Sequence, residues 1–111
     1  TVLNLGSGGR FNDRANAVAL DSAGRIYVVG NTENSTRGQG FVIRLTPTGQ
    51  LDSTFALAGR FVLTDGSANP GAYRFNDVAI DSAGRLLVVG TVEKTTGTLN
   101  QGYAMRLLSN G

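Results

Sequence analysis

The residue types that most enzymes use for acid–base and nucleophilic chemistry are missing from this chain. It contains no histidine and no cysteine, which excludes imidazole bases, thiolate nucleophiles, disulfides and most zinc or copper sites. Lys94 is the single lysine, so only a hydroxyl paired with that amine, or two carboxylates, are left for catalysis. No spacing marks a particular pair. We therefore expect no catalytic residue, no metal site and no cofactor, and the sequence favours a non-catalytic protein.

Two aspartates recur in the same local sequence, Asp-Ser-Ala-Gly-Arg, at Asp21 and at Asp81. A carboxylate could act as an acid or hold a metal ion, but Asp-x-x-Gly between two apolar runs is typical of a tight hairpin turn. In such a turn the aspartate bonds to the turn backbone, and the glycine takes a positive φ that would cost another residue about 1 kcal/mol. We therefore predict a turn role for both aspartates and a positive φ at Gly24 and Gly84.

Two arginines, Arg44 and Arg106, also recur, each between apolar residues. A guanidinium in that position could bind the carboxylate or phosphate of a ligand through two hydrogen bonds. A structural partner is the favoured alternative, either Asp52 after the same apolar run or a backbone carbonyl of an adjacent repeat.

The charge pattern gives little support for nucleic-acid or membrane binding. The formal net charge is +2, and the ten basic residues are spread along the chain, so there is no basic block. No stretch approaches the roughly 20 apolar residues that span a bilayer. Residues 1–15 lack the charged start and apolar run of a signal peptide. We expect no nucleic-acid partner and no membrane insertion.

The strongest signal in the sequence is an internal repeat. Asn16–Gly30 reads NAVALDSAGRIYVVG, and Asn76–Gly90 reads NDVAIDSAGRLLVVG sixty residues later. The similarity continues downstream, where Gly40–Leu45 matches Gly102–Leu107 after a two-residue insertion. A period of this length is typical of repeat architectures, in which each unit is one supersecondary element.

The repeat divides the chain into two similar units with strands shared across their boundary. Residues 1–50 form the first blade-like repeat, and residues 51–111 form the second. Short β-branched runs between clusters of Gly, Asn, Asp, Ser and Thr predict antiparallel strands and turns. The expected strands are Val18–Leu20, Arg25–Val29, Phe41–Thr46, Arg60–Thr64, Val78–Ile80, Arg85–Val89 and Tyr103–Leu108.

Residues 26–29 and 86–89 are apolar at every position instead of alternately. This pattern predicts strands buried on both faces. A sheet that lies between two neighbouring sheets, as in a radial stack, has that requirement. The sequence therefore predicts an all-β fold, a β-propeller fragment of two four-stranded antiparallel blades.

In a propeller the first strand of each blade lines the central channel, and repetition brings one polar residue of each blade toward a common point. Arg14, Asn16, Arg74 and Asp77 lie on or just before these strands, and they are the candidate ligand-binding residues on the channel side. The alternative for Asn16 is that it satisfies backbone groups where the strand begins.

The order of motifs resembles one known repeat family. Asp-Ser-Ala-Gly-Arg precedes an apolar strand that ends at Gly30, Arg-Leu follows at Arg44, and Gly-Gln-Leu-Asp-Ser-Thr-Phe covers residues 49–55. This order is similar to the bacterial delta-60 repeat. At the other junction Thr1–Leu5 replaces the Leu-Asp-x-x-Phe signature. The resemblance implies propeller blades in long, often secreted or surface-associated proteins, and it supplies no catalytic residues.

Three functions remain open. The favoured one is a non-catalytic binding or interaction scaffold with a glycan or protein ligand. The alternatives are a polysaccharide-active enzyme with a channel site that uses Asp77 with Arg14 or Arg74, and a structural spacer of a larger surface protein.

Two blades alone would expose an apolar face at each end, which we expect to be lined by residues such as Val28, Val29, Val88 and Val89. Because propellers close with about four to eight blades, we expect identical chains to close a ring of three or four copies. Residues 1–11 would then supply the outer strand for the last blade of a neighbour.

Overall fold

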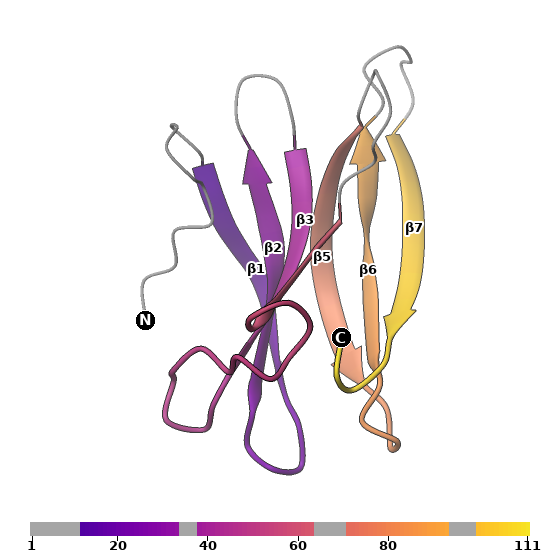
Figure 1. Ribbon diagram of the computed structural model, residues 1–111. Helices are drawn as coiled ribbons and strands as arrows, with labels where there is room; N and C mark the ends of the chain where they lie inside the picture. Colours follow the sequence, from indigo (N-terminus) through magenta and orange to yellow (C-terminus); the bar gives the residue numbers. More distant parts are fainter. Residues whose placement is uncertain (1–11, 34–37, 64–70, 94–99) are drawn as a thin grey trace.

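The computed structural model describes residues 12–33, 38–63, 71–93 and 100–111, and every regular element in these ranges is a β-strand. The first sheet has the order β1-β2-β3-β4, and the second has the order β5-β6-β7 (Figure 1). All neighbouring strands are antiparallel. The strands are β1 (Asn12–Leu20), β2 (Ile26–Glu33), β3 (Gly38–Leu45), β4 (Arg60–Leu63), β5 (Ala72–Ile80), β6 (Leu86–Glu93) and β7 (Asn100–Leu107).

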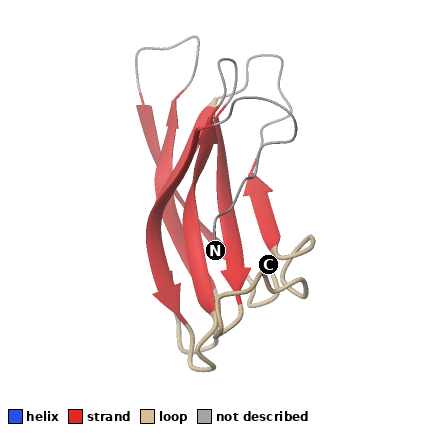
Figure 2. Cartoon of the chain, turned by 90° about the vertical axis from the view of Figure 1, so that its left-hand side faces the viewer, coloured by secondary structure: helices blue, strands red, loops and turns tan. Residues whose placement is uncertain are grey.

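The predicted all-β, antiparallel architecture is confirmed, and the first sheet has the expected four strands. β4 lies beyond residue 50 and pairs with β3 of the first sheet; the division of the chain into repeats at residue 50 stays a prediction. Three strands are described in the second sheet. Figure 2 shows the described chain as strands joined by turns. Within the described ranges, no helix is long and apolar enough to cross a membrane.

The hairpin turns have the predicted geometry. Gly24 has φ 79° and Gly84 has φ 77°, and each donates its backbone N–H to the carbonyl of the aspartate three residues earlier at 3.0 Å. The Asp21 carboxylate accepts the backbone N–H groups of Ala23 and Arg25 at 2.9 Å each, and Asp81 repeats this pattern. Both aspartates therefore shape turns, as predicted.

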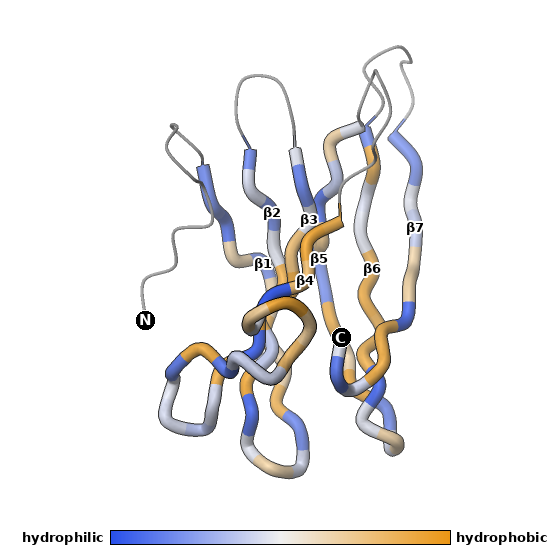
Figure 3. The backbone as a smooth tube through the Cα atoms, viewed as in Figure 1, coloured by the Kyte–Doolittle hydropathy of each residue, from blue (hydrophilic) through white to orange (hydrophobic). Residues whose placement is uncertain are grey.

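The first strand of each sheet is longer than the apolar pattern predicted. β1 begins at Asn12 instead of Val18, because its ladder with β2 continues through polar residues as far as the Asn12–Glu33 pair. A register shift between Ala15 and Ala17 interrupts the ladder, and an equivalent shift lies in β5 between Phe75 and Asp77. Such bulges re-aim side chains. Figure 3 shows the hydrophilic character of the upper ends of β1, β2 and β7.

The two sheets pack face to face around one main apolar core. Sheet 1 is the sheet of β1–β4, and sheet 2 is the sheet of β5–β7. The face of sheet 1 that packs on sheet 2 is its front face, and the equivalent face of sheet 2 is the front face of that sheet. The opposite face of each sheet is its back face, so the front face of sheet 1 packs on the back face of sheet 2. The front face of sheet 1 contributes Ala17, Ala19, Tyr27, Val29 and Val42 to the core, and the back face of sheet 2 contributes Val78, Ile80, Leu86, Val88 and Met105.

The other two faces lie on the outside of the chain. On the back face of sheet 1, Val18 and Leu20 of β1 are 60% and 65% exposed, whereas Phe41, Ile43 and Leu45 of β3 are buried in a second apolar cluster. On the front face of sheet 2, Leu87 and Val89 are 44% and 46% exposed. Apolar faces at both ends were expected. Among the described residues nothing covers the front face of β6, so the burial of this strand on both faces stays a prediction that depends on a further sheet.

The expected lining of the end faces also needs correction. Val29 and Val88 are fully buried between the two sheets, while Val28 is half-buried and Val89 is exposed. Neighbouring residues of a strand point to opposite faces, so a run of four apolar residues supplies two to each face. The end faces therefore take Val28 and Val89 but not their neighbours.

Candidate functional site

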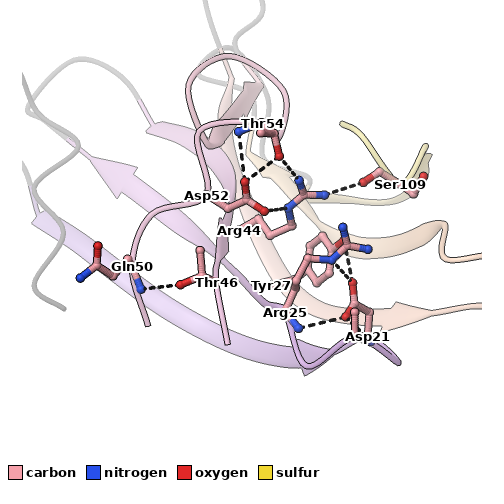
Figure 4. Close-up of polar contacts among 10 residues, drawn as sticks. Asp21, Arg25, Tyr27, Arg44, Thr46, Gln50, Asp52, Thr54 and Ser109 are labelled. Carbon is pink, nitrogen blue, oxygen red and sulfur yellow. Dashed lines mark hydrogen bonds and ion pairs between the residues drawn. The ribbon is translucent and has the colours of Figure 1, made fainter. Parts of the chain in front are cut away.

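The most elaborate polar cluster joins the two sheets at Arg44, near the C-terminal end of β3 (Figure 4). This residue is 3% exposed. Its guanidinium donates from Nε to Asp52 Oδ2 at 2.8 Å and from Nη2 to Thr54 Oγ1 at 2.8 Å. Its Nη1 donates to the backbone carbonyl of Ser109, at 2.9 Å, in the turn that follows β7. Arg44 has both structural partners that the sequence suggested.

Aromatic rings complete the surroundings of the Arg44 guanidinium. Its Cζ atom lies 5.1 Å from the ring centroid of Phe55 and 5.9 Å from that of Tyr27. The two rings pack edge to face with centroids 5.7 Å apart, and both are buried. Cation–π contact adds to the hydrogen bonds. A guanidinium enclosed in this way serves the packing of the two sheets and leaves no face for an external ligand.

The carboxylate partner of this cluster is held in its charged form. The Thr54 hydroxyl donates to Asp52 Oδ1 at 2.6 Å, and the Thr54 backbone N–H donates to the same atom at 3.1 Å. The hydrogen bond from the Thr54 hydroxyl is the main cause that lowers the pKa of Asp52 below 3.8. The Arg44 guanidinium lowers this pKa further, whereas burial of the carboxylate raises it. A depressed pKa means that folding favours the ionised carboxylate.

This pKa predicts how stability depends on pH. Because the pKa of Asp52 is lower in the folded than in the unfolded chain, its contribution is complete above about pH 4 and disappears as the pH falls through the folded-state value. We expect the free energy of unfolding to fall in acid, and to fall less steeply in an Asp52→Asn variant, which is also less stable at pH 7. Urea titrations between pH 2 and pH 7 measure both quantities. Identical acid slopes for the two proteins would contradict this assignment.

A second group of polar contacts joins sheet 1 to β5 of sheet 2. Asn16 lies at the bulge of β1, where its Nδ2 donates to Asn31 Oδ1 at 3.0 Å and to the Phe75 carbonyl of the other sheet at 2.7 Å. The predicted alternative, that Asn16 satisfies backbone groups, matches this geometry, with the difference that the carbonyl belongs to the neighbouring sheet.

Arg74 links carboxylates of both sheets. Its Nε lies 2.6 Å from Glu33 Oε1 in sheet 1, and its Nη1 lies 3.0 Å from Glu93 Oε2 in sheet 2. The hydrogen bond to Glu33 is the main cause that raises the pKa of Arg74. The two glutamates were missed in the sequence, although Glu33 and Glu93 recur sixty residues apart just as Arg14 and Arg74 do.

The structure brings two of the four candidate ligand-binding residues together. Asn16 and Arg74 both take part in contacts between the sheets. Arg14 is exposed on β1, and Asp77 is exposed on β5, where its Oδ1 accepts the backbone N–H of Val78 at 2.8 Å. Ligand binding by these four residues stays a prediction.

In the described part of the chain, no group of three or more His, Cys, Asp or Glu residues could hold a metal ion.

One family model matches part of this chain. It is described as a domain of unknown function (DUF5122) beta-propeller, and it matches residues 24–55, from the glycine of the first hairpin turn to the Phe55 ring. No curated protein and no solved structure gives a significant match. The matched segment contains the β2–β3 hairpin and the Arg44 cluster, so the family similarity falls on the contacts that join one sheet to the next.

Proposed function

We propose that this chain is a non-catalytic β-propeller repeat module of the delta-60 type that acts as a binding or interaction scaffold, built by stacking one sheet on the next. The observation that carries the proposal is the use of its recurrent polar residues. Asp21 and Asp81 shape turns, and Arg44, Asn16 and Arg74 bind groups of the neighbouring sheet. Residues committed to turns and stacking are not free for catalysis.

The exposed faces support stacking of further sheets. The front face of sheet 2 carries Leu87 and Val89, which occupy the repeat positions of the buried residues Tyr27 and Val29. The back face of sheet 1 carries Val18 and Leu20 at the positions of Val78 and Ile80. These exposed residues are therefore the repeat equivalents of residues that are already packed between the two sheets. Contacts of this head-to-tail type close into rings when the rotation per chain divides a full turn.

A charge pair supports the same geometry. Inside the chain, Arg74 of sheet 2 binds Glu33 of sheet 1. Their repeat equivalents are Arg14, exposed on sheet 1, and Glu93, 52% exposed on sheet 2. In a head-to-tail contact, Glu93 of one chain would meet Arg14 of the next. We propose rings of three or four identical chains, which native mass spectrometry of the 111-residue chain tests directly. A folded monomer at micromolar concentration would refute the ring.

The charge pair also allows the two ring sizes to be distinguished. We expect Glu93→Arg or Arg14→Glu alone to place like charges across every contact and to weaken association by about tenfold per contact. In an equimolar mixture, a contact between the two different variants again pairs opposite charges. Every contact of a ring is restored only if the two variants alternate around it. Alternation closes with four chains and not with three, so recovery of the complete ring in native mass spectra of the mixture indicates four.

The control for the charge exchange is Arg25→Glu, which changes charge by the same amount at a hairpin turn. It should leave assembly unchanged, and equal weakening of assembly by all three variants would rule out the Glu93–Arg14 contact.

A glycan and peptide array, probed with the assembled protein, tests which ligand the scaffold binds. Reproducible turnover of any substrate there, abolished by Asp77→Asn, would favour an enzyme instead.

A further inference from the structure

Sheet 1 shows how one segment completes a blade. After β3 the chain turns back through residues 51–59 and adds β4 to the edge of β3, with Val42 opposite Phe61. The backbone N–H of Asp52 donates to the carbonyl of Arg44 at 2.9 Å, and the N–H of Arg44 donates to the carbonyl of Gly59 at 3.1 Å. The segment thus contributes a strand, a carboxylate for Arg44 and the buried Phe55 ring.

Sheet 2 has the same acceptor groups. Its strand β7 repeats β3 with a spacing of 62 residues and pairs, among the described residues, with β6 alone. Arg106 corresponds to Arg44 but is exposed, and no described residue gives it a carboxylate. A hollow of about 340 Å³ lies beside it. The lining of this hollow is Leu87, Val88, Val89, Ala104, Met105 and Arg106.

The lining of the hollow includes the repeat equivalents of two residues that the Phe55 ring contacts in sheet 1. There the ring packs on Tyr27 and under the Arg44 guanidinium. The equivalents of those two residues, Leu87 and Arg106, line the hollow. An incoming apolar side chain would cover Leu87, and a neighbouring carboxylate would reach Arg106 as Asp52 reaches Arg44.

We propose that β7 and this hollow form an acceptor site for an extended Leu-Asp-x-x-Phe segment with the pattern of residues 51–63, provided by another polypeptide segment. Backbone pairing with the edge of β7 that no described strand occupies gives affinity, and the aspartate gives selectivity through Arg106. This inference deepens the proposed scaffold function and rests on it for the equivalence of the two sheets.

The competing occupant is the N-terminal segment of a second copy. In the repeat alignment, Val2 takes the position of Asp52 and Leu5 takes that of Phe55. That segment has no carboxylate for Arg106, so we expect the pattern of residues 51–63 to bind more tightly.

Fluorescence anisotropy with a labelled peptide of residues 51–63 tests the site on the whole chain. We expect saturable binding of one peptide per chain. The same peptide with Asp52→Asn should bind at least tenfold more weakly, because a charge-assisted hydrogen bond to a guanidinium is lost. Arg106→Gln in the chain should cause a similar loss. Arg25→Gln, the control at an arginine of the other sheet, should bind as the wild-type chain does.

A photoreactive group at the Phe61 position of the peptide locates the complex. Because Phe61 lies opposite Val42, and Ala104 is the repeat equivalent of Val42, the cross-link is expected at or beside Ala104. Absence of saturable binding, equal affinity of the Arg106→Gln chain, or equal affinity of a peptide of residues 1–13 would each overturn the proposal. A monomeric chain that binds the peptide as expected would refute the ring alone.

Discussion

Replacing Arg44 with methionine is expected to lower the free energy of unfolding by about 3 kcal/mol, since removing one partner of a buried ion pair leaves the other charge uncompensated. Methionine keeps the apolar stem of the side chain, so the expected loss comes from the guanidinium. It includes the bonds to Asp52, Thr54 and the carbonyl of Ser109. Urea denaturation followed by circular dichroism measures the change.

The matched control for Arg44 is Arg85→Met. Arg85 binds Asp81 with a 2.7 Å contact of the same Nε–Oδ2 type, but its side chain is 40% exposed. Exposed pairs contribute about 0–1 kcal/mol, so this variant should lose less than about 1 kcal/mol. Equal losses in the two variants would show that burial of the Arg44 cluster contributes nothing to stability.

The sequence allowed the prediction of those features that depend on local chemistry. Asp-x-x-Gly determines a turn by itself, because the aspartate bonds within the turn and glycine tolerates positive φ. The predicted turns at Gly24 and Gly84 are therefore confirmed. Arg44 was predictable for a related reason, since the Asp52 partner lies close in sequence and follows the same strand.

Contacts between the sheets were harder to predict, because they depend on how two sheets are placed. Asn16 bonds to a carbonyl 59 residues away, and Arg74 bonds to Glu33 at a separation of 41 residues. Neither separation leaves a local pattern. The ion pairs between Arg25 and Asp21 and between Arg85 and Asp81 were also missed, although the repeated spacing of four residues was a usable signal.

The direction of each apolar side chain was predicted only in part. A continuous apolar run shows that both faces of a strand need cover, but it does not show which neighbour supplies the cover. Val88 is covered by sheet 1, whereas Val89 points to the outside of the chain. The repeat shows which face each apolar side chain points to only after the pairing register of the strands is known, because equivalent repeat positions then lie on equivalent faces.

The aromatic contact between the sheets gives the other large expected effect. Phe75 is fully buried, and its ring lies against the backbone of β3 at Gly40, where an added Cβ would be 2.4 Å from the ring. The ring also packs on Tyr103, with centroids 5.9 Å apart. Because Gly40 has no side chain, the Phe75 ring can lie directly against the backbone of β3.

We therefore expect Phe75→Ala to lower the free energy of unfolding by about 3–5 kcal/mol through lost burial and the cavity that remains. Phe75→Leu keeps more of the volume and should lose less. Leu57→Ala, at a residue that is 82% exposed, is the control and should change stability by less than about 0.5 kcal/mol. Urea denaturation of the three variants gives the comparison. If Phe75→Ala lost no more free energy of unfolding than Leu57→Ala, the packing of sheet 2 on sheet 1 at Gly40 would not stabilise the chain. The proposed stacking of further sheets through equivalent faces would then lose its physical basis.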